Sequence, residues 1–507
     1  MFRSILITFL LSYCTCLFTQ PIYSREFEAR RKNVPLAIIN NNTNFFYLLR
    51  YNKAAHDITI ERRANPSAEI LSFTPLKLDS VNAKWYDYEK FDYLFFEQNY
   101  HVYFLFEKFL NTKKTLFLKV ADTLGKSSGF IELASIEKEN GVTDINFEFK
   151  RSANNCILIV ASQTYGMFGV KKVALLFDLE KRRVVWTKKL PFENASTGYS
   201  TAFLCNDLND FFYVLVKARV SGYKRKNIQH EQVQVPVLYY DSLSVISFIN
   251  GNMFFTKKNL AINNFDVLGT LQLFSFEKDI VASVYYSKKE NLGVLKTHFL
   301  NQRFSSNLST EIYSNITLLD STVEKSLTFY DGTDFKAAGE KEYKHFINYQ
   351  IGNFNYAITE RVEEYYYKEL FIWKNDLATG TVSQQKIIPR KIYSFKGRTR
   401  YKNIGKAMPF FCNQTPHFVI LESPLNSKKD PNDFNYHRFK KETNLWKSHI
   451  MMYSLTEKGA LEKKLIYHNS IFDAIPLPYQ AMNKEDFILY LNNGNTEKFA
   501  ILKLNQL

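Results

Sequence analysis

Short runs of strand-forming residues, each introduced by a polar turn residue, recur along this chain. The run "CILIVAS" follows Asn155, and the run "FFYVLVKA" follows Asp210. Asn and Asp suit turns because their side chains bond to nearby backbone and because they tolerate the left-handed conformation. β-Branched and aromatic residues pack well on the pleated surface of a sheet. The pattern therefore predicts β-strands that begin directly after turns.

The same signal returns at a nearly regular spacing. After most turns of this kind a second pair of strand-forming runs follows, as "VALLFDLE" does after Asn155. Several short strands per unit, repeated every several tens of residues, are typical of a β-propeller. We therefore predict an all-β chain that forms a single seven- or eight-bladed β-propeller over residues 25–507, with repeat anchors near residues 44, 99, 155, 210, 279, 353, 414 and 486.

The last unit of the chain is too short to form a whole blade. Asp486–Leu507 has room for roughly two strands. A propeller removes its open edge by closing the ring, so we expect the segment around Val34–Ile39 to complete the last blade. The polar insertions Ser221–Gln234 and Asn426–Thr443 are interpreted as long loops.

A cluster of basic residues, Lys181-Arg182-Arg183, poses a choice between a binding site and a turn. The polar stretch Asp178–Arg183 separates the apolar runs "VALLF" and "VVW", and no aromatic residue lies within it. A hairpin must reverse direction at such a place. We interpret the cluster as the turn of a β-hairpin.

The first residues have the pattern of an export signal. Arg3 precedes an apolar stretch, Ile5–Phe18, which is short for a membrane span and ends in the polar pair Tyr23-Ser24. We predict a signal peptide over residues 1–24 and an exported protein that is periplasmic, outer-membrane-associated or extracellular. No later stretch is long enough for a transmembrane helix. Lipidation stays open, since Cys14 and Cys16 lie in the apolar stretch.

Three cysteines, Cys156, Cys205 and Cys412, follow the predicted signal. An odd and sparse set does not form a disulfide scaffold. One disulfide and a free buried thiol are both open alternatives. No Cys-x-x-Cys pair remains to indicate a zinc ribbon.

The charge of the chain indicates which partners are favoured. There are 66 Lys and Arg against 50 Asp and Glu, which gives a net charge of +16 and a pI near 9.2. A basic balance favours acidic partners, although basic residues spread along a chain are also common on solvated strands and loops. Because the predicted export argues against nucleic acid, we expect an envelope protein or an acidic glycan as partner and a monomeric chain.

Four short motifs resemble known sites but lack parts that the chemistry needs. Gly125–Gly129, "GKSSG", fits a nucleophile elbow, yet it lies in an all-β context. "HEQVQ" at His230 has Gln234 where a zinc protease needs a second His. Asp430–Asn435 lacks the central Gly and distal Glu of a calcium loop. Glu360, Glu363 and Glu364 could form a glycosidase pair, but neighbours on a strand point to opposite faces, and we interpret the segment as a loop leading into a strand. We predict no metal and no cofactor.

One basic stretch, Arg390–Lys406, is a candidate ligand site. Its basic residues alternate with aromatic ones, and Arg forks bind carboxylate, sulfate or phosphate while aromatic faces stack on sugar rings. The alternative is a solvated hairpin between two blades. The candidate ligand-binding residues are Arg390, Tyr393, Lys396, Arg398, Arg400, Tyr401 and Lys402.

Residues 140–422 resemble a family of secreted, uncharacterised β-propeller proteins of Bacteroidota. The resemblance rests on "NFEFKRSANNCILIVAS", "VALLFDLEKRRVVWTKKLP", "VASVYYSKKENLGVLKTHFLN" and "NYAITERVEEYYYKELFIWKNDLATGTVSQQKIIPRK". In that family an acidic-then-tyrosine run precedes a strand, and a basic "IPRK"-like turn follows. The Gly-rich turns of many related blades are scarce in this chain. The resemblance implies a propeller at the cell envelope and no catalytic residues.

From these observations we predict an exported, non-catalytic propeller that binds or scaffolds at the cell envelope, with function on its loop-bearing face. The alternative is a carbohydrate-active enzyme, a polysaccharide lyase or hydrolase, with its site at the propeller channel. A lyase would use Arg or Lys to neutralise a uronate and Tyr or His as base.

Overall fold

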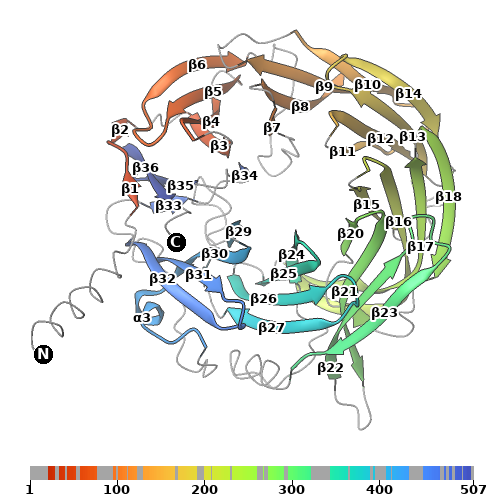
Figure 1. The fold of residues 1–507 in the computed structure, drawn as a ribbon. Helices are drawn as coiled ribbons and strands as arrows, with labels where there is room; N and C mark the ends of the chain where they lie inside the picture. The colour runs from red at the N-terminus through yellow and green to blue at the C-terminus, as the bar shows by residue number, and fades with distance from the viewer. Residues whose placement is uncertain are drawn as a thin grey trace, which may run out of the picture.

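The computed structural model is an all-β, propeller-like fold built from antiparallel sheets. It describes residues 21–28, 33–39, 43–52, 57–76, 95–98, 101–110, 112–122, 129–152, 154–165, 170–190, 199–206, 208–228, 231–249, 251–259, 266–267, 272–289, 295–320, 343–363, 366–388, 392–393, 407–412, 414–432, 449–468, 473–475, 479–481, 486–493 and 495–503. In Figure 1 the sheets follow one another around a ring. Within each sheet the strands succeed one another from the centre of the ring outward.

The described strands form eight sheets; six are made of strands that follow one another along the chain, and the first and eighth combine strands from both ends of it. The first four sheets are β3 (Asn33–Ile39), β4 (Phe45–Asn52), β5 (Asp57–Ala64) and β6 (Ile70–Leu76); β7 (Phe95–Gln98), β8 (His101–Leu110), β9 (Lys113–Asp122) and β10 (Ile131–Glu137); β11 (Asp144–Arg151), β12 (Cys156–Thr164), β13 (Val170–Asp178) and β14 (Arg183–Lys189); and β15 (Tyr199–Cys205), β16 (Phe211–Ile228), β17 (Glu231–Ile249) and β18 (Asn252–Asn259).

The other four sheets continue the series. They are β19 (Asp266–Val267), β20 (Gln272–Phe276), β21 (Asp279–Lys289), β22 (Leu295–Phe304) and β23 (Glu311–Leu318); β24 (Tyr343–Ile351), β25 (Phe354–Glu363), β26 (Tyr366–Asp376), β27 (Val382–Ile388) and β28 (Ile392–Tyr393); β29 (Met408–Cys412), β30 (Thr415–Glu422), β31 (His449–Leu455) and β32 (Leu461–His468); and β33 (Asp473–Ile475), β35 (Asp486–Asn492) and β36 (Thr496–Lys503) with β1 (Ile22–Tyr23) and β2 (Phe27–Glu28). A single short helix, α3 (Pro424–Ser427), follows β30 in the described part of the chain.

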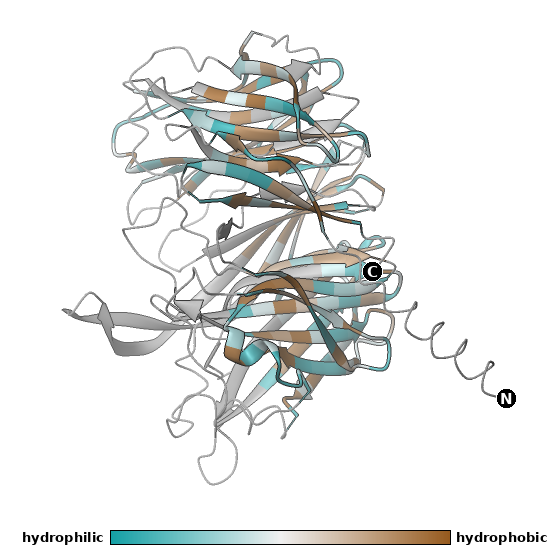
Figure 2. Ribbon diagram, turned by 90° about the vertical axis from the view of Figure 1, so that its left-hand side faces the viewer, coloured by the Kyte–Doolittle hydropathy of each residue, from teal (hydrophilic) through white to brown (hydrophobic). Residues whose placement is uncertain are grey.

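Apolar side chains are buried between neighbouring sheets rather than in one central core. For example, Val419 and Leu421 of the seventh sheet pack against Phe487 and Leu489 of the eighth. Comparable described clusters join the other consecutive sheets from the second to the eighth, and one joins the eighth to the first. In Figure 2 the strands carry apolar, brown segments among polar, teal ones, and strands such as β12 and β35 are buried over nearly their whole length. The sheets from the third to the eighth are thus each packed against two neighbours.

The sequence anchors lie where the first strand of a sheet turns into the second. Asn155 and Gln414 occupy the left-handed region there, with φ of 66° and 62°, which Asn adopts more readily than most residues. Asp210 and Asn353 directly precede β16 and β25, and Asp279 and Asp486 begin β21 and β35. Asn44 directly precedes β4, while residue 99 lies outside the described residues.

The basic cluster after β13 is a turn, as the sequence predicts. β13 and β14 pair around residues 179–182, and Arg182 has a φ of 51°. The Asp178 carboxylate accepts hydrogen bonds from the backbone N–H groups of Glu180 and Lys181 at 3.0 and 2.9 Å. This carboxylate caps the turn, so the three basic residues are explained without a ligand.

Two expectations from the sequence were wrong. Val34–Ile39 belongs to β3 in the first sheet, and the eighth sheet is instead completed by β1 and β2, which pair with β36. The expected loop Ser221–Gln234 lies largely within β16 and β17, which pair with each other along a long hairpin. The sequence pattern failed here because these strands carry many polar residues.

The ring is also closed from the C-terminal side. β34 (Tyr479–Ala481) pairs with β3 in parallel, so the end of the chain adds a strand to the first sheet. The three described cysteines, Cys156, Cys205 and Cys412, form no disulfide. In the portion of the chain that the structure describes, no helix has the length and apolar character of a membrane span.

Candidate functional site

Most of the basic stretch predicted to bind a ligand cannot be placed. Six of the seven predicted residues lie outside the described residues: Arg390, Lys396, Arg398, Arg400, Tyr401 and Lys402. Tyr393 lies in β28, where its backbone pairs with that of Tyr366 at the start of β26. This places one member of the stretch beside the sixth sheet.

The remaining motifs have structural explanations where the structure describes them. Glu360 is 2% exposed, and its carboxylate accepts a hydrogen bond from the backbone N–H of Ala407 at 3.1 Å. Asp430 caps the backbone N–H of Asn432 at 2.8 Å. His230 and residues 125–128 lie outside the described residues. Among the described side chains, no group of three or more His, Cys, Asp or Glu is arranged to hold a metal ion.

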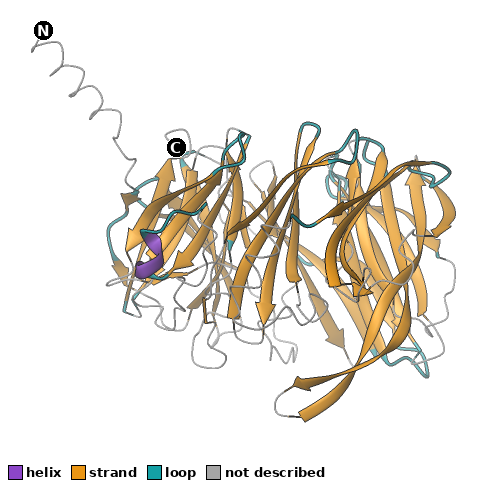
Figure 3. Cartoon of the chain, turned by 90° about the horizontal axis from the view of Figure 1, so that it is seen from below, coloured by secondary structure: helices purple, strands orange, loops and turns teal. Residues whose placement is uncertain are grey.

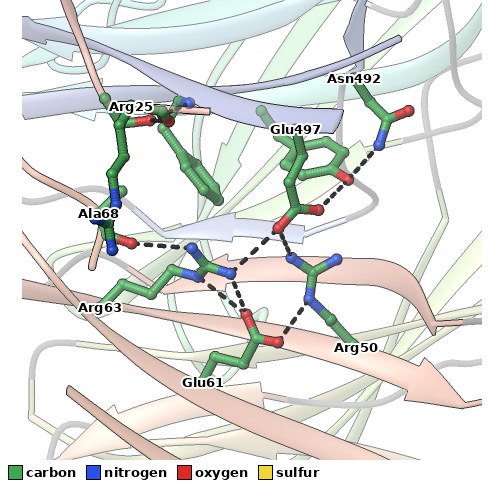
Figure 4. Close-up of polar contacts among 10 residues, drawn as sticks. Arg25, Arg50, Glu61, Arg63, Ala68, Asn492 and Glu497 are labelled. Atoms are coloured by element: carbon green, nitrogen blue, oxygen red, sulfur yellow. Dashed lines mark hydrogen bonds and ion pairs between the residues drawn. The ribbon is translucent and has the colours of Figure 1, made fainter. Parts of the chain in front are cut away.

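The largest cluster of buried charges lies between the first and eighth sheets (Figure 4). We call it the closing junction: Arg50, Glu61, Arg63 and Glu497. Glu61 accepts hydrogen bonds from Arg50 Nε at 2.9 Å and from Arg63 Nη2 at 2.6 Å. Glu497 Oε1 accepts from both Arg50 Nη2 and Arg63 Nη2, so each carboxylate joins both guanidinium groups.

The closing junction is neutral and nearly fully satisfied. All four residues are at most 2% exposed. Burial alone would raise the pKa of Glu61, but Arg50 and Arg63 hold it below its usual value. Tyr490 donates to the second oxygen of Glu497 at 2.8 Å. A charge cluster so enclosed has no face for a substrate, and its position indicates that it fixes how the last sheet meets the first.

A second cluster lies at one end of the strands of the seventh sheet, and its members differ in their exposure to solvent. We call it the histidine rim: Glu422, His449, Tyr453, Lys463 and His468. Glu422 ends β30, His449 begins β31 and His468 ends β32, and backbone register places them in one row, Glu422 opposite His449 and His449 opposite His468. Glu422 is buried, His449 is half-buried and His468 is exposed.

The two imidazoles of the histidine rim are in direct contact. His468 Nδ1 lies 2.9 Å from His449 Nε2, and the rings are nearly perpendicular with centroids 4.2 Å apart. Only one of these two nitrogens carries the shared hydrogen in a neutral pair, so each ring sets the tautomer of the other. Burial and the neighbouring His468 lower the pKa of His449, which favours its neutral form.

Glu422 is held by donors on one side only. Tyr453 donates to its Oε1 at 2.9 Å, and Lys463 Nζ lies 3.8 Å from the same oxygen. Burial raises the pKa of Glu422 and lowers that of Lys463, which weakens the charge on both. Glu422 Oε2 and His449 Nδ1 are both buried without a hydrogen-bond partner. Two unpartnered polar atoms on opposed residues indicate a place for a bridging water or an entering polar group.

The connection that carries the basic stretch is residues 389–406. It begins and ends at the same end of the strands as the histidine rim. β27 ends at Ile388, and Ala407 precedes β29, whose Met408 pairs with Val419 near the end of β30. The hydrogen bond from Ala407 to Glu360 joins this edge to the end of β25 in the sixth sheet. The residues that flank this connection, Ile388 and Ala407, therefore lie at the same end of the strands in the sixth and seventh sheets.

Sequence reasoning missed the histidine rim because no motif joins its members. His449 opens the run "HIMMYSL" and His468 closes the run "LEKKLIYH". A hairpin pairs the first residue of one strand with the last residue of the next. That rule, applied to the two runs, would have brought the histidines together.

No protein-family model and no curated protein matches the sequence. Among solved structures, the chain is similar to the polysaccharide lyase Uly1, with 9% identity over 96% of this chain and 98% of that one and a TM-score of 0.40. It is also similar to an ulvan lyase, described as a new polysaccharide lyase family, with 8% identity over 88% and 96% and a TM-score of 0.39. A protein of unknown function from Dyadobacter fermentans gives 8% identity over 71% and 94%, with a TM-score of 0.30. At these TM-scores none of the likenesses supports an inference about activity, and the resemblance to a Bacteroidota family stays a prediction.

Proposed function

We propose that this chain is an exported, eight-bladed propeller that cleaves acidic polysaccharides by proton abstraction and elimination at the histidine rim. The observation that supports the proposal is the contact between His449 and His468 beside the buried Glu422. Imidazole is the side chain used most often to take and return a proton in catalysis. The net charge of +16 favours an acidic substrate.

Within this proposal each side chain has a defined role. His449 Nε2 accepts the hydrogen of His468 Nδ1, which leaves the second nitrogen of the exposed His468 as the free base. His449 Nδ1 then carries its own hydrogen, and His449 is paired in register with Glu422, whose unpartnered Oε2 is proposed to accept that hydrogen through a bridging water. Glu422 is itself positioned by Tyr453 and Lys463.

The proposed step is an elimination. His468 takes the proton from the sugar carbon beside the uronate carboxyl group. The electron pair of that C–H bond forms a carbon–carbon double bond while the bond to the leaving glycosidic oxygen breaks. The leaving oxygen then takes the proton back from the imidazolium, so no water is consumed. Arg398 and Arg400, in the connection that begins and ends at this edge, are proposed to neutralise the uronate carboxylate.

Elimination is favoured over hydrolysis by the residues at the rim. A glycosidase needs two carboxyl groups on either side of the bond that breaks. Glu422 is buried at 2% exposed and already accepts from Tyr453, and Glu360, at the end of β25 in the sixth sheet, accepts from the backbone of Ala407. One exposed base with a carboxylate behind it suits proton abstraction better.

A non-catalytic binding or scaffolding role at the envelope is the second candidate, and one feature favours it. β15 pairs with β16 only as far as Lys217, and β18 pairs with β17 only from Ser242. In the described residues, 218–228 and 231–240 therefore pair with each other alone, and the hairpin extends past the other strands in Figure 3. Its charged residues are mostly basic: Arg219, Lys224, Arg225 and Lys226 against Glu231 and Asp241. Such an arm would bind an acidic polymer without chemistry.

A single experiment separates the two candidates. The purified exported chain is incubated with a panel of uronate-containing polysaccharides, and the unsaturated product is followed by ultraviolet absorbance while binding is measured in parallel. We expect the unchanged chain to form the unsaturated product. The His468→Gln variant should lose at least about 100-fold in kcat. The control is Glu462→Gln, an exposed residue on the same strand, which should keep full activity. Binding without product for any polymer would overturn the elimination and favour the binding role.

A further inference from the structure

The last residues of the predicted export leader, with those that follow it, form two short strands of the fold. Ile22 and Tyr23 of β1 pair with Ile501 and Ala500 of β36. Phe27 and Glu28 of β2 continue the same edge. In the described part of the eighth sheet, these residues are what pairs with the outer edge of β36.

Ser24 lies at the centre of this pairing. Its backbone N–H donates to the carbonyl of Phe499 at 2.9 Å, and its hydroxyl oxygen accepts from the backbone N–H of Phe499 at 3.0 Å. The residue is 7% exposed. A chain that began at Arg25 would lose both bonds together with β1, and it would leave the backbone of β36 without this partner from Phe499 to Ile501.

Side chains on both sides of Ser24 also contact other parts of the ring. The Tyr23 ring lies 6.0 Å from that of Tyr467 in the seventh sheet, and Lys498 lies 5.3 Å from its centroid. Phe27 packs beside Phe499, and the Arg63 guanidinium of the closing junction lies 4.9 Å above the Phe27 ring. The segment thus joins the eighth sheet to both of its neighbours.

We propose that the export leader is cut before Pro21, so that residues 21–28 stay in the mature protein as the strand that closes the ring. This proposal rests on the predicted export, and it replaces the predicted cut after Ser24. Small residues suited to a leader peptidase lie upstream, at Thr15, Cys16 and Thr19. A cut there spares every contact described above.

The first test reads the cut directly. The full 507-residue chain with a C-terminal tag is produced in a host that exports it, and the exported protein is analysed by intact mass and N-terminal sequencing. A first residue between 16 and 21 supports the proposal, with or without the added mass of a lipid on Cys16. A first residue at 22 or later, or a chain that keeps its whole leader, overturns it.

The second test measures whether the segment stabilises the fold, independently of export and of any activity. Chains that begin at Pro21 and at Arg25 are made without a leader, and their urea midpoints are compared. We expect the longer chain to unfold at a clearly higher midpoint, and Ser24→Ala in the longer chain to lie between the two. Equal midpoints for the two chains, or folding of the shorter chain alone, would overturn the proposal. Because neither chain is assayed on a polysaccharide, failure of the proposed elimination would leave this result unchanged.

Discussion

The closing junction and the histidine rim both bury a carboxylate, but they leave it in opposite conditions. At the junction, Glu61 and Glu497 each join two guanidinium groups, and the pKa of Glu61 lies below its usual value. At the rim, Glu422 has one oxygen without a partner, and burial raises its pKa. Complete pairing makes a charge inert and structural, whereas incomplete pairing beside an exposed base leaves a group ready for proton transfer.

The largest effect is expected from breaking the closing junction. Glu497→Gln removes the charge that joins Arg50 to Arg63 and leaves a net positive charge buried between two sheets. Uncompensated buried charge costs roughly 3–5 kcal/mol, so the urea midpoint should fall steeply. Glu462→Gln, exposed on β32, is the control. A loss below about 1 kcal/mol would show that the junction does not hold the ring closed.

A smaller effect is expected from the rim. Tyr453→Phe removes the donor to Glu422 Oε1, and hydrogen bonds to charged groups contribute about 1.5–3 kcal/mol. The free energy of unfolding should fall by about 2 kcal/mol, while proton transfer at the rim weakens because Glu422 loses its support. The matched control is Tyr349→Phe, whose hydroxyl donates to the neutral carbonyl of Pro409 at 3.1 Å. If the two variants lose equal stability, Glu422 is neutral in the folded protein.

How far the sequence could predict these two regions follows from how each is built. The strands and their turns were predictable because residues such as Asn155 act locally, through their own backbone. The closing junction joins Arg63 to Glu497 across almost the whole chain, and no local pattern carries that information. The histidine rim depends on a hairpin register. Arg398 and Arg400, which the alternation of basic and aromatic residues indicated as ligand-binding candidates, lie outside the described residues.

A third prediction concerns pH and the opposite end of the seventh sheet. Burial lowers the pKa of His417 to about 4, and its Nδ1 lies 2.8 Å from the Ser454 hydroxyl. Because the unfolded chain binds this proton near pH 6.5 and the folded chain does not, stability should fall as pH drops from about 6.5 toward 4. At pH 5 the loss from this group should be below about 2 kcal/mol. Unfolding at pH 7 and pH 5 should show a smaller difference for His417→Gln than for the wild type, and an unchanged difference would contradict the assignment.

The smallest effect is expected from a solvent-exposed ion pair next to the closing junction. Arg25, labelled in Figure 4, forms an ion pair with Glu69 at 3.4 Å, with side chains 66% and 53% exposed. Arg25 and the buried Arg63 both lie over the Phe27 ring. Exposed pairs contribute about 0–1 kcal/mol because solvent screens them and because two long side chains must be ordered. Glu69→Gln should therefore shift the urea midpoint very little, and added salt should abolish even that shift. A loss as large as that of Glu497→Gln would mean that position at the junction, rather than burial and pairing, decides how much a charge stabilises the ring.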